Sequence, residues 1–162
     1  MILNKKELEQ SAKDMLLKRG VTMDDIADLV YFLQESYVPG LTLDRCKENI
    51  EAVLAKREVQ NAIITGIQLD VLAEQKKLVA PLQEMLEHDA GLYGVDEILA
   101  LGIVNVYGSI GFTNYGYIDK VKPGILAKLN DHNTEMVHTF LDDIVGAIAA
   151  AAASRLAHSI PE

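Results

Sequence analysis

The chain contains no tryptophan, and aromatic residues make up only 6% of its 162 residues. This length is enough for one well-filled hydrophobic core. Because bulky rings are scarce, we expect an aliphatic core, which suits helices packed closely through alanine and glycine. Hydrophobic residues reach 49% and charged residues 24%, values that are ordinary for a folded domain and argue against disorder.

Cysteine and basic residues are also scarce. Cys46 is the only cysteine, which excludes an intrachain disulfide, a CxxC site and a thiolate metal cluster. It falls in a helical pattern, so we expect it to pack in the core. Lysine and arginine number 15 against 24 acidic residues, giving a formal net charge of −9. This balance argues against nucleic acid as the main partner and against electrostatic adsorption to an anionic bilayer.

Targeting and membrane-spanning signals are missing as well. The fully apolar run 144–153 has only ten residues, whereas a helix needs about 20 to cross a bilayer. Residues 1–6 lack the apolar core of a secretory signal peptide. We therefore expect no transmembrane segment and a cytoplasmic location, and the residues leave open a peripheral association with a membrane.

The pattern of apolar residues predicts an all-α, single-domain helical bundle over residues 1–162, because no segment alternates with period two long enough to form a strand. Asn4 with Glu7, Thr22 with Asp25, and Thr42 are typical of helix N-termini. Pro81 is favoured at the start of a short helix. Residues 62–72 either continue the preceding helix or begin a new one, and the glycine-rich segment 108–117 is favoured as a helix over a loop.

The C-terminal helix is predicted to be the centre of the bundle. From Ile144 to Ala153 every side is apolar or small, and a helix without a polar face has to be buried. Thr134 is a candidate for its N-cap. Residues 95–107 predict a second buried helix.

Both of these helices carry an acidic pair at the head, Asp142–Asp143 and Asp96–Glu97. If the heads lie side by side, four carboxylates converge at one end of the bundle. Helix N-termini favour each negative side chain by only about 0.3–1 kcal/mol, which does not offset the repulsion of four clustered anions. A hard divalent cation such as Mg²⁺ does, since it prefers oxygen ligands. In the alternative reading, these acids only cap their helices.

A third segment adds a carboxylate and two lysines. Asp119 lies midway between the acidic pairs in sequence and is followed by Lys120 and Lys122. A carboxylate beside lysines suits a metal-and-phosphate site, in which the lysines stabilise charge on the phosphoryl oxygens.

Three segments carry a family resemblance: HDAGLYGVDE at 88–97, IDKVKP at 118–123 and LDDIVGA at 141–147. In their order and spacing the chain resembles the phosphatidylglycerophosphatase A family over residues 41–158. Residues 1–40 look like the helical extension of a soluble subgroup, which is also similar to proteins named low-temperature requirement protein C. Where the family usually places an arginine, three residues before Asp119, this chain has Gly116.

The resemblance implies a Mg²⁺-dependent phosphatase that converts phosphatidylglycerophosphate to phosphatidylglycerol. The catalytic residues would be Asp96, Glu97, Asp142 and Asp143, and Lys120 and Lys122 would contact the phosphate. The carboxylates implied to hold metal or activate water are Asp89, Asp96, Glu97, Asp119, Asp142 and Asp143.

Other functions stay open at the level of sequence. The partner is expected to be a phosphate ester, either a phospholipid headgroup or a soluble compound. The main rival is a catalytically silent helical interaction protein, and self-association into a homo-oligomer is also left open. A nucleotide pyrophosphohydrolase is disfavoured, because the chain lacks a Glu-Glu-x-x-Glu acidic helix face.

Overall fold

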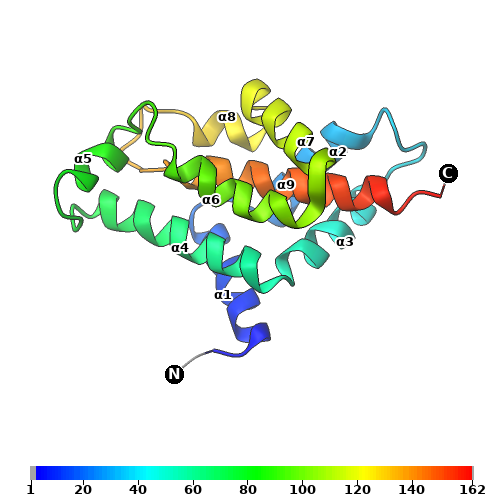
Figure 1. Ribbon diagram of the computed structural model, residues 1–162, viewed down its shortest axis with the longest axis horizontal. Coiled ribbons are helices and arrows are strands. Elements are labelled where there is room, and N and C mark those ends of the chain that lie inside the picture. Colours follow the sequence, from blue (N-terminus) through cyan, green and yellow to red (C-terminus); the bar gives the residue numbers. More distant parts are fainter. Residues whose placement is uncertain (1–2, 162) are drawn as a thin grey trace.

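The computed structural model describes residues 3–161, and over this range the backbone forms helices and no β-strand. The predicted domain bounds include Met1, Ile2 and Glu162, which lie outside the described residues. Figure 1 shows the arrangement of the helices. In chain order they are α1 (Lys5–Lys18), α2 (Met23–Gln34), α3 (Leu43–Leu54), α4 (Arg57–Glu74), α5 (Leu82–Glu87), α6 (Val95–Val104), the 3₁₀ turn η1 (Asn105–Tyr107), α7 (Gly108–Val121), α8 (Ile125–Leu129) and α9 (Leu141–His158). The all-α prediction is confirmed.

Helix α9 passes lengthwise through the middle of the molecule (Figure 1) and contacts α2, α3, α4, α6, α7 and α8. Every residue from Ile144 to Leu156 except Arg155 is buried. Alanine has the highest helix propensity, and its small side chain lets the surrounding helices approach closely. The prediction of a buried central helix is therefore confirmed, and it sets the position of everything at its N-terminal end.

Local start signals were reliable for the N-terminal helices. Asn4 and Thr22 form capping boxes with Glu7 and Asp25, and the side chain of Thr42 accepts from a backbone N–H of α3. Cys46 is buried in the core, as expected, and burial raises the pKa of its thiol to about 11.

Two predicted helix starts were wrong. Thr134 lies in a loop, and α9 begins at Leu141 with Phe140 at the N-cap, whose side chain makes no capping hydrogen bond. Pro81 is itself the N-cap of α5 rather than its first residue. The start of α9 is instead set by a side chain from α4, which no local pattern around residue 134 reveals.

The segment predicted as a second buried helix is only partly buried. Its α-helix ends at Val104, and Val95, Ile98 and Val106 are exposed. Gly108, with φ 77° and ψ −161°, then turns the chain into α7. This conformation is almost restricted to glycine. The glycine-rich segment 108–117 is helical, as predicted, and α7 returns toward the start of α6.

Residues 62–72 belong to a new helix, α4, which begins at Arg57 after α3 has ended at Leu54, so they do not continue the preceding helix. Helix α4 approaches α9 and α6 most closely at Gly66. A Cβ on Gly66 would overlap Ile144 Cδ1 and lie 3.0 Å from Leu99 Cδ2 and 3.1 Å from Phe140 Cβ. Glycine is required at this position because the helices leave no room for a side chain.

We expect Gly66→Ala to destabilise the protein by about 1–3 kcal/mol, because an added methyl group overpacks a closed core. Gly102 is the matched control, since a Cβ there would meet nothing within 4 Å. Gly102→Ala should stabilise by about 0.5–1 kcal/mol, the difference between alanine and glycine inside a helix. Urea unfolding of both variants measures the effect, and equal free energies would contradict the close approach at Gly66.

Candidate functional site

The acidic residues singled out in the sequence come together at one pole of the bundle. Asp142 and Asp143 lie in the first turn of α9, and Asp96 and Glu97 lie in the first turn of α6. Asp119 lies near the end of α7. With Asp89 and Lys122 they line a pocket of about 370 Å³, which the 90–94 loop and Asn130 complete. Four segments distant in sequence therefore contribute carboxylates to one cavity.

The two lysines have different positions. Lys120 is exposed and is not among the residues that line the pocket. Lys122 ends α7 in a left-handed conformation, with φ 49° and ψ 55°. Its Nζ lies 3.0 Å from Asp119 Oδ1 and 3.4 Å from Asp142 Oδ2. Burial lowers the pKa of Lys122, but these two carboxylates outweigh burial and raise it, so the ammonium group stays charged.

Asp142 and Asp143 are buried, which is costly for two adjacent carboxylates. Burial, together with the charges of Asp142 and Asp96, raises the pKa of Asp143. Burial also raises the pKa of Asp142, and Lys122 opposes that shift. The hydroxyl of Tyr115 donates to Asp143 Oδ1 at 3.2 Å. Burial and mutual repulsion therefore both disfavour the doubly charged form of this pair.

The loop before α6 has a strained backbone. Asp89 and Leu92 have φ values of 46° and 64°, although neither is glycine. Non-glycine residues rarely adopt a positive φ, and those that do concentrate at functional sites. Asp89 is held at the pocket in this way, and burial, followed by the charge of Asp96, raises the pKa of its carboxyl group.

Asp70 positions the acidic head of α9. It is fully buried on α4, and its Oδ1 and Oδ2 accept hydrogen bonds from the backbone N–H groups of Phe140 and Leu141 at 3.0–3.2 Å. Burial raises the pKa of Asp70 to about 8, although these hydrogen bonds oppose the shift. The sequence analysis did not single out Asp70. Its spacing from Ile63 and Ile67 was a usable signal, because it places Asp70 on the buried stripe of α4 and so predicts a buried carboxylate.

A second network holds the segment that leads into α9. Arg19 donates to Glu74 at 3.0 and 3.1 Å and to the carbonyl oxygen of Val137 at 2.8 Å. Glu74 in turn accepts from the backbone N–H of Val137 at 2.9 Å. The pKa of Glu74 is lowered, mainly by its hydrogen bond with Arg19.

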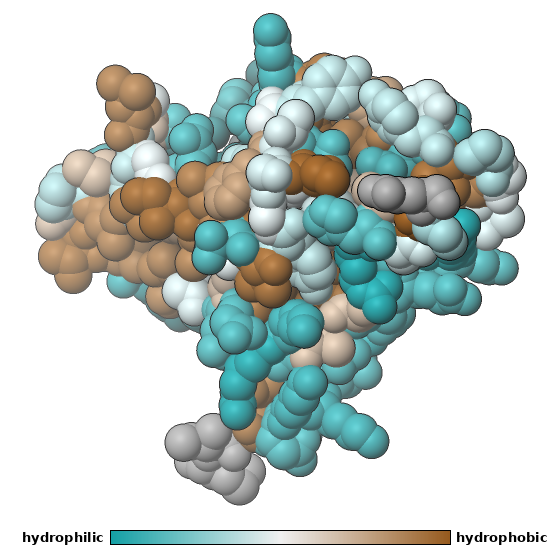
Figure 2. All heavy atoms as spheres, turned by 45° about the vertical axis from the view of Figure 1, so that its right-hand side comes forward, coloured by the Kyte–Doolittle hydropathy of each residue, from teal (hydrophilic) through white to brown (hydrophobic). Residues whose placement is uncertain are grey.

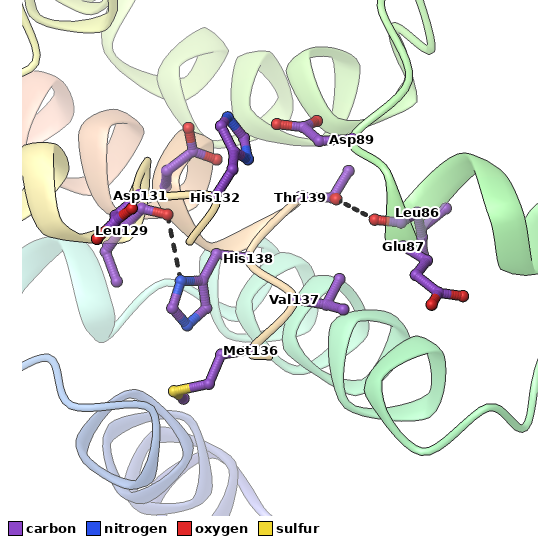
Figure 3. A pocket seen from close by; sticks show the side chains of 11 residues that line it. Leu86, Glu87, Asp89, Leu129, Asp131, His132, Met136, Val137, His138 and Thr139 are labelled. Carbon is purple, nitrogen blue, oxygen red and sulfur yellow. Dashed lines mark hydrogen bonds between the residues drawn. The ribbon is translucent and has the colours of Figure 1, made fainter. Parts of the chain in front are cut away.

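A small cavity of about 30 Å³ lies behind the acidic pocket and shares Asp89 and Asp142 with it. Figure 3 shows the side chain of Thr139 directed toward Leu86, whose carbonyl oxygen accepts its hydroxyl at 2.6 Å. His138 points away from Asp89, with Nδ1 3.2 Å from the carbonyl oxygen of Leu129 (Figure 3). Burial lowers the pKa of His138, so its ring is neutral and does not offset the acids.

The donor chemistry of the pocket fits a hard cation. Its carboxylates are oxygen ligands of the type that Mg²⁺ prefers. Burial first, and neighbouring carboxylates second, raise the pKa values of Asp142 and Asp143, and a cation would stabilise their charged forms. Among residues 3–161, no group of three or more His, Cys, Asp or Glu side chains is already arranged as a metal site.

The fold and pocket define an all-α protein with an anionic site built at the head of its central helix. The chain belongs to the phosphatidylglycerophosphatase A family, whose model matches residues 16–158. The match includes much of the segment 1–40, which the sequence analysis assigns to an extension.

Close relatives share the whole fold. The chain is 68% identical over 152 residues to the uncharacterized protein YutG of Bacillus subtilis, covering 94% of this chain and 92% of that protein. It superposes on the crystal structure of the low temperature requirement C protein from Listeria monocytogenes with a TM-score of 0.92 and 74% identity, covering 94% and 96% of the two chains. The crystal structure of YpjQ from Bacillus subtilis gives a TM-score of 0.93 at 57% identity, with 97% of each chain covered.

We expect Asp70→Ala to lower the free energy of unfolding by about 2–4 kcal/mol, because two buried N–H groups at the start of α9 lose their acceptor. Asp70→Asn keeps an acceptor oxygen and should lose less. Asp14→Ala, an exposed change on α1, serves as control and should stay within about 0.5 kcal/mol of the wild type. Urea unfolding checks the order, and equal losses for Asp70→Ala and Asp14→Ala would contradict the capping role.

Proposed function

We propose that the protein is a divalent-cation-dependent phosphomonoesterase that acts on a phosphate carried by a lipid headgroup. The observation that carries the proposal is the convergence of six carboxylates and Lys122 on one pocket at the head of α9. The family supports the same reaction, because its description names a phosphatidylglycerophosphatase.

The carboxylates would hold the cation, which we expect to be Mg²⁺. This set is Asp89, Asp96, Glu97, Asp119, Asp142 and Asp143. When bound, the cation neutralises charge on the phosphoryl oxygens and lowers the pKa of a coordinated water. Without it, a phosphate would meet six carboxylates and a single ammonium group, so the pocket would repel its substrate.

The residues of the chain bind the phosphate and orient the water. Lys122 Nζ lies between Asp119 and Asp142, and in the proposed reaction it would donate to a phosphoryl oxygen. Since Gly116 replaces the family's arginine, Lys122 supplies the cationic side chain of the pocket. One of Asp96, Glu97, Asp142 and Asp143 accepts a hydrogen bond from the attacking water and orients it in line with the ester bond.

In the reaction the water oxygen bonds to phosphorus and the bond from phosphorus to the ester oxygen breaks. The proton released by the water passes to the departing oxygen. The products are inorganic phosphate and an alcohol. For a lipid substrate, this alcohol is the lipid itself, with a hydroxyl group where the headgroup carried its phosphate. No redox partner or second substrate is required.

We expect phosphate release from phosphatidylglycerophosphate in detergent with Mg²⁺ and none with chelator. Asp142→Asn should reduce the rate on the order of 100-fold or more, as when a charged group is removed from a preorganised site. Asp44→Asn is the matched control, because Asp44 lies in the first turn of α3 and is exposed. The same assay is also run with soluble phosphate esters and with nucleoside triphosphates as substrates. Release from triphosphates alone, or undiminished release by Asp142→Asn, would reject the assignment.

Mg²⁺ should also raise the melting temperature of the wild type. At about 100 times the dissociation constant, binding stabilises a fold by about 2.7 kcal/mol, which corresponds to a shift of about 5–10 °C for a chain of this size. Asp142→Asn should abolish the shift, and Asp44→Asn should keep it. The quantity compared is the shift, since removing a buried charge changes the melting temperature by itself. Equal shifts in all three proteins would place the cation elsewhere.

A further inference from the structure

Residues 98–118 form an uncharged run beside the acidic pocket. These 21 residues contain no Asp, Glu, Lys, Arg or His, although a quarter of the whole chain is charged. Asp96 and Glu97 precede the run and Asp119 follows it, and all three line the pocket. The run therefore leaves the pocket along α6, turns at Gly108 and returns to the pocket along α7.

Much of this run and its flanks is exposed, although it is apolar. By length and composition the stretch Val95–Val121 could cross a membrane, yet only 22% of its most apolar window is buried. Figure 2 shows hydrophobic residues gathered in a band on the side where α6 lies. Ile98 is 67% exposed, and the large apolar residues exposed here are Leu92, Val95, Ile98, Val106, Ile110, Phe112, Tyr117 and Val121. On α7, Tyr117 stacks on Phe32 of α2, and Ile110 lines a separate pocket with Gln34 and Tyr37. We call the four residues on and beside α6, which are Leu92, Val95, Ile98 and Val106, the apolar face.

The apolar face is suited to lie on a bilayer rather than to cross it. The turn at Gly108 divides the stretch into α6, with 10 residues, and α7, with 14 residues. A spanning helix needs about 20 residues, so neither is long enough. A helix with an apolar side and little charge can instead bury that side at the boundary between headgroups and acyl chains.

An apolar groove extends this face away from the pocket. It lies between α4 and α6 and has a volume of about 370 Å³. The α6 side is apolar, with Val95, Ile98, Leu99 and Gly102, whereas the α4 side consists of Ala62 and the polar residues Glu58, Asn61 and Thr65. Val95 is adjacent in sequence to Asp96 of the acidic pocket. A molecule with a phosphate at one end and a hydrocarbon chain at the other therefore meets matching surfaces on consecutive turns of one helix.

We propose that the apolar face docks on the surface of a phospholipid bilayer, with the groove between α4 and α6 taking up acyl chain. This inference rests on the proposed function for the identity of the phosphate ester. The position of Leu92 favours a bilayer over a second copy of the chain. Leu92 is fully exposed and also lines the acidic pocket, so a protein packed on this face would cover the entrance, whereas a bilayer presents headgroups to it.

The net charge decides what kind of bilayer is the better probe. With a formal charge of −9, the protein is repelled by anionic lipid, so docking has to come from apolar burial. Binding should therefore be seen with zwitterionic phosphatidylcholine vesicles, and it should be the same at low and high salt.

The test is flotation of the full chain with phosphatidylcholine vesicles in the absence of metal. Ile98→Glu should lower the ratio of bound to free protein on the order of tenfold or more, because it removes a large apolar group and places a carboxylate at the interface. Leu17→Glu is the matched control on α1, where Leu17 is 61% exposed, and it should bind like the wild type. The vesicle binding of Ile98→Gln should lie between that of Ile98→Glu and that of the wild type. An unchanged melting temperature of this variant would exclude misfolding as the cause of weaker binding.

Three results would overturn the inference: wild type that stays free of vesicles, equal binding by Ile98→Glu and Leu17→Glu, or a wild-type dimer that Ile98→Glu separates without changing vesicle binding. Light scattering during size exclusion detects the third result. Asp142→Asn separates the inference from the proposed function, because this variant should bind vesicles while losing phosphate release. Vesicle binding by a wild type that hydrolyses no ester would uphold the docking face and reject the phosphatase.

Discussion

The N-terminal end of α9 holds two carboxylates inside the protein, because every residue from Leu141 to Ser154 is buried. Asp142 and Asp143 are fixed there by the alanine-rich core that follows them. Two side chains offset part of the cost of burying them: Tyr115 donates to Asp143, and Lys122 pairs with Asp142. Asp70 fixes the start of the helix by accepting from the backbone N–H of Phe140. The architecture of the pole follows from this single constraint.

These contacts do not neutralise the pole. Six carboxylates line the pocket and Lys122 is the cationic side chain among its lining residues. The pKa values of Asp142, Asp143 and Asp89 are raised mainly by burial, and neighbouring carboxylates add to each shift. Structural carboxylates are normally paired one to one, so an unbalanced cluster is better explained by a ligand that brings positive charge. This electrostatic imbalance is the physical basis of the proposed cation-dependent site.

One of the helices that supply the acids also supplies the apolar face. Helix α6 places Asp96 in the pocket and, two residues later, Ile98 on the surface. The left-handed glycine at position 108 converts a stretch long enough to span a bilayer into two short helices that return to the same pole. Because of this turn, polar chemistry and apolar surface lie next to each other, as a substrate with a phosphate and a hydrocarbon part requires.

Several features could be predicted from sequence because their causes are local. The burial of α9 follows from the absence of any polar residue in 144–153, and the capping residues Asn4, Thr22 and Thr42 act on N–H groups two or three residues away. The acidic pairs at the heads of α6 and α9 were visible for the same reason. The helical state of 108–117 was also favoured correctly.

Tertiary structure decided the features whose causes lie far away in the chain. The start of α9 depends on Asp70, which is 70 residues distant from Phe140, so Thr134 was a misleading local signal. The exposure of Ile98 depends on which helices cover α6, and the composition of α6 is as apolar as that of a buried helix. The sequence by itself determined which segments are helical and which helix is central, because propensity and patterning act within a few residues. Only packing decided which carboxylates face one another and which apolar side remains uncovered, because those outcomes depend on contacts between distant helices.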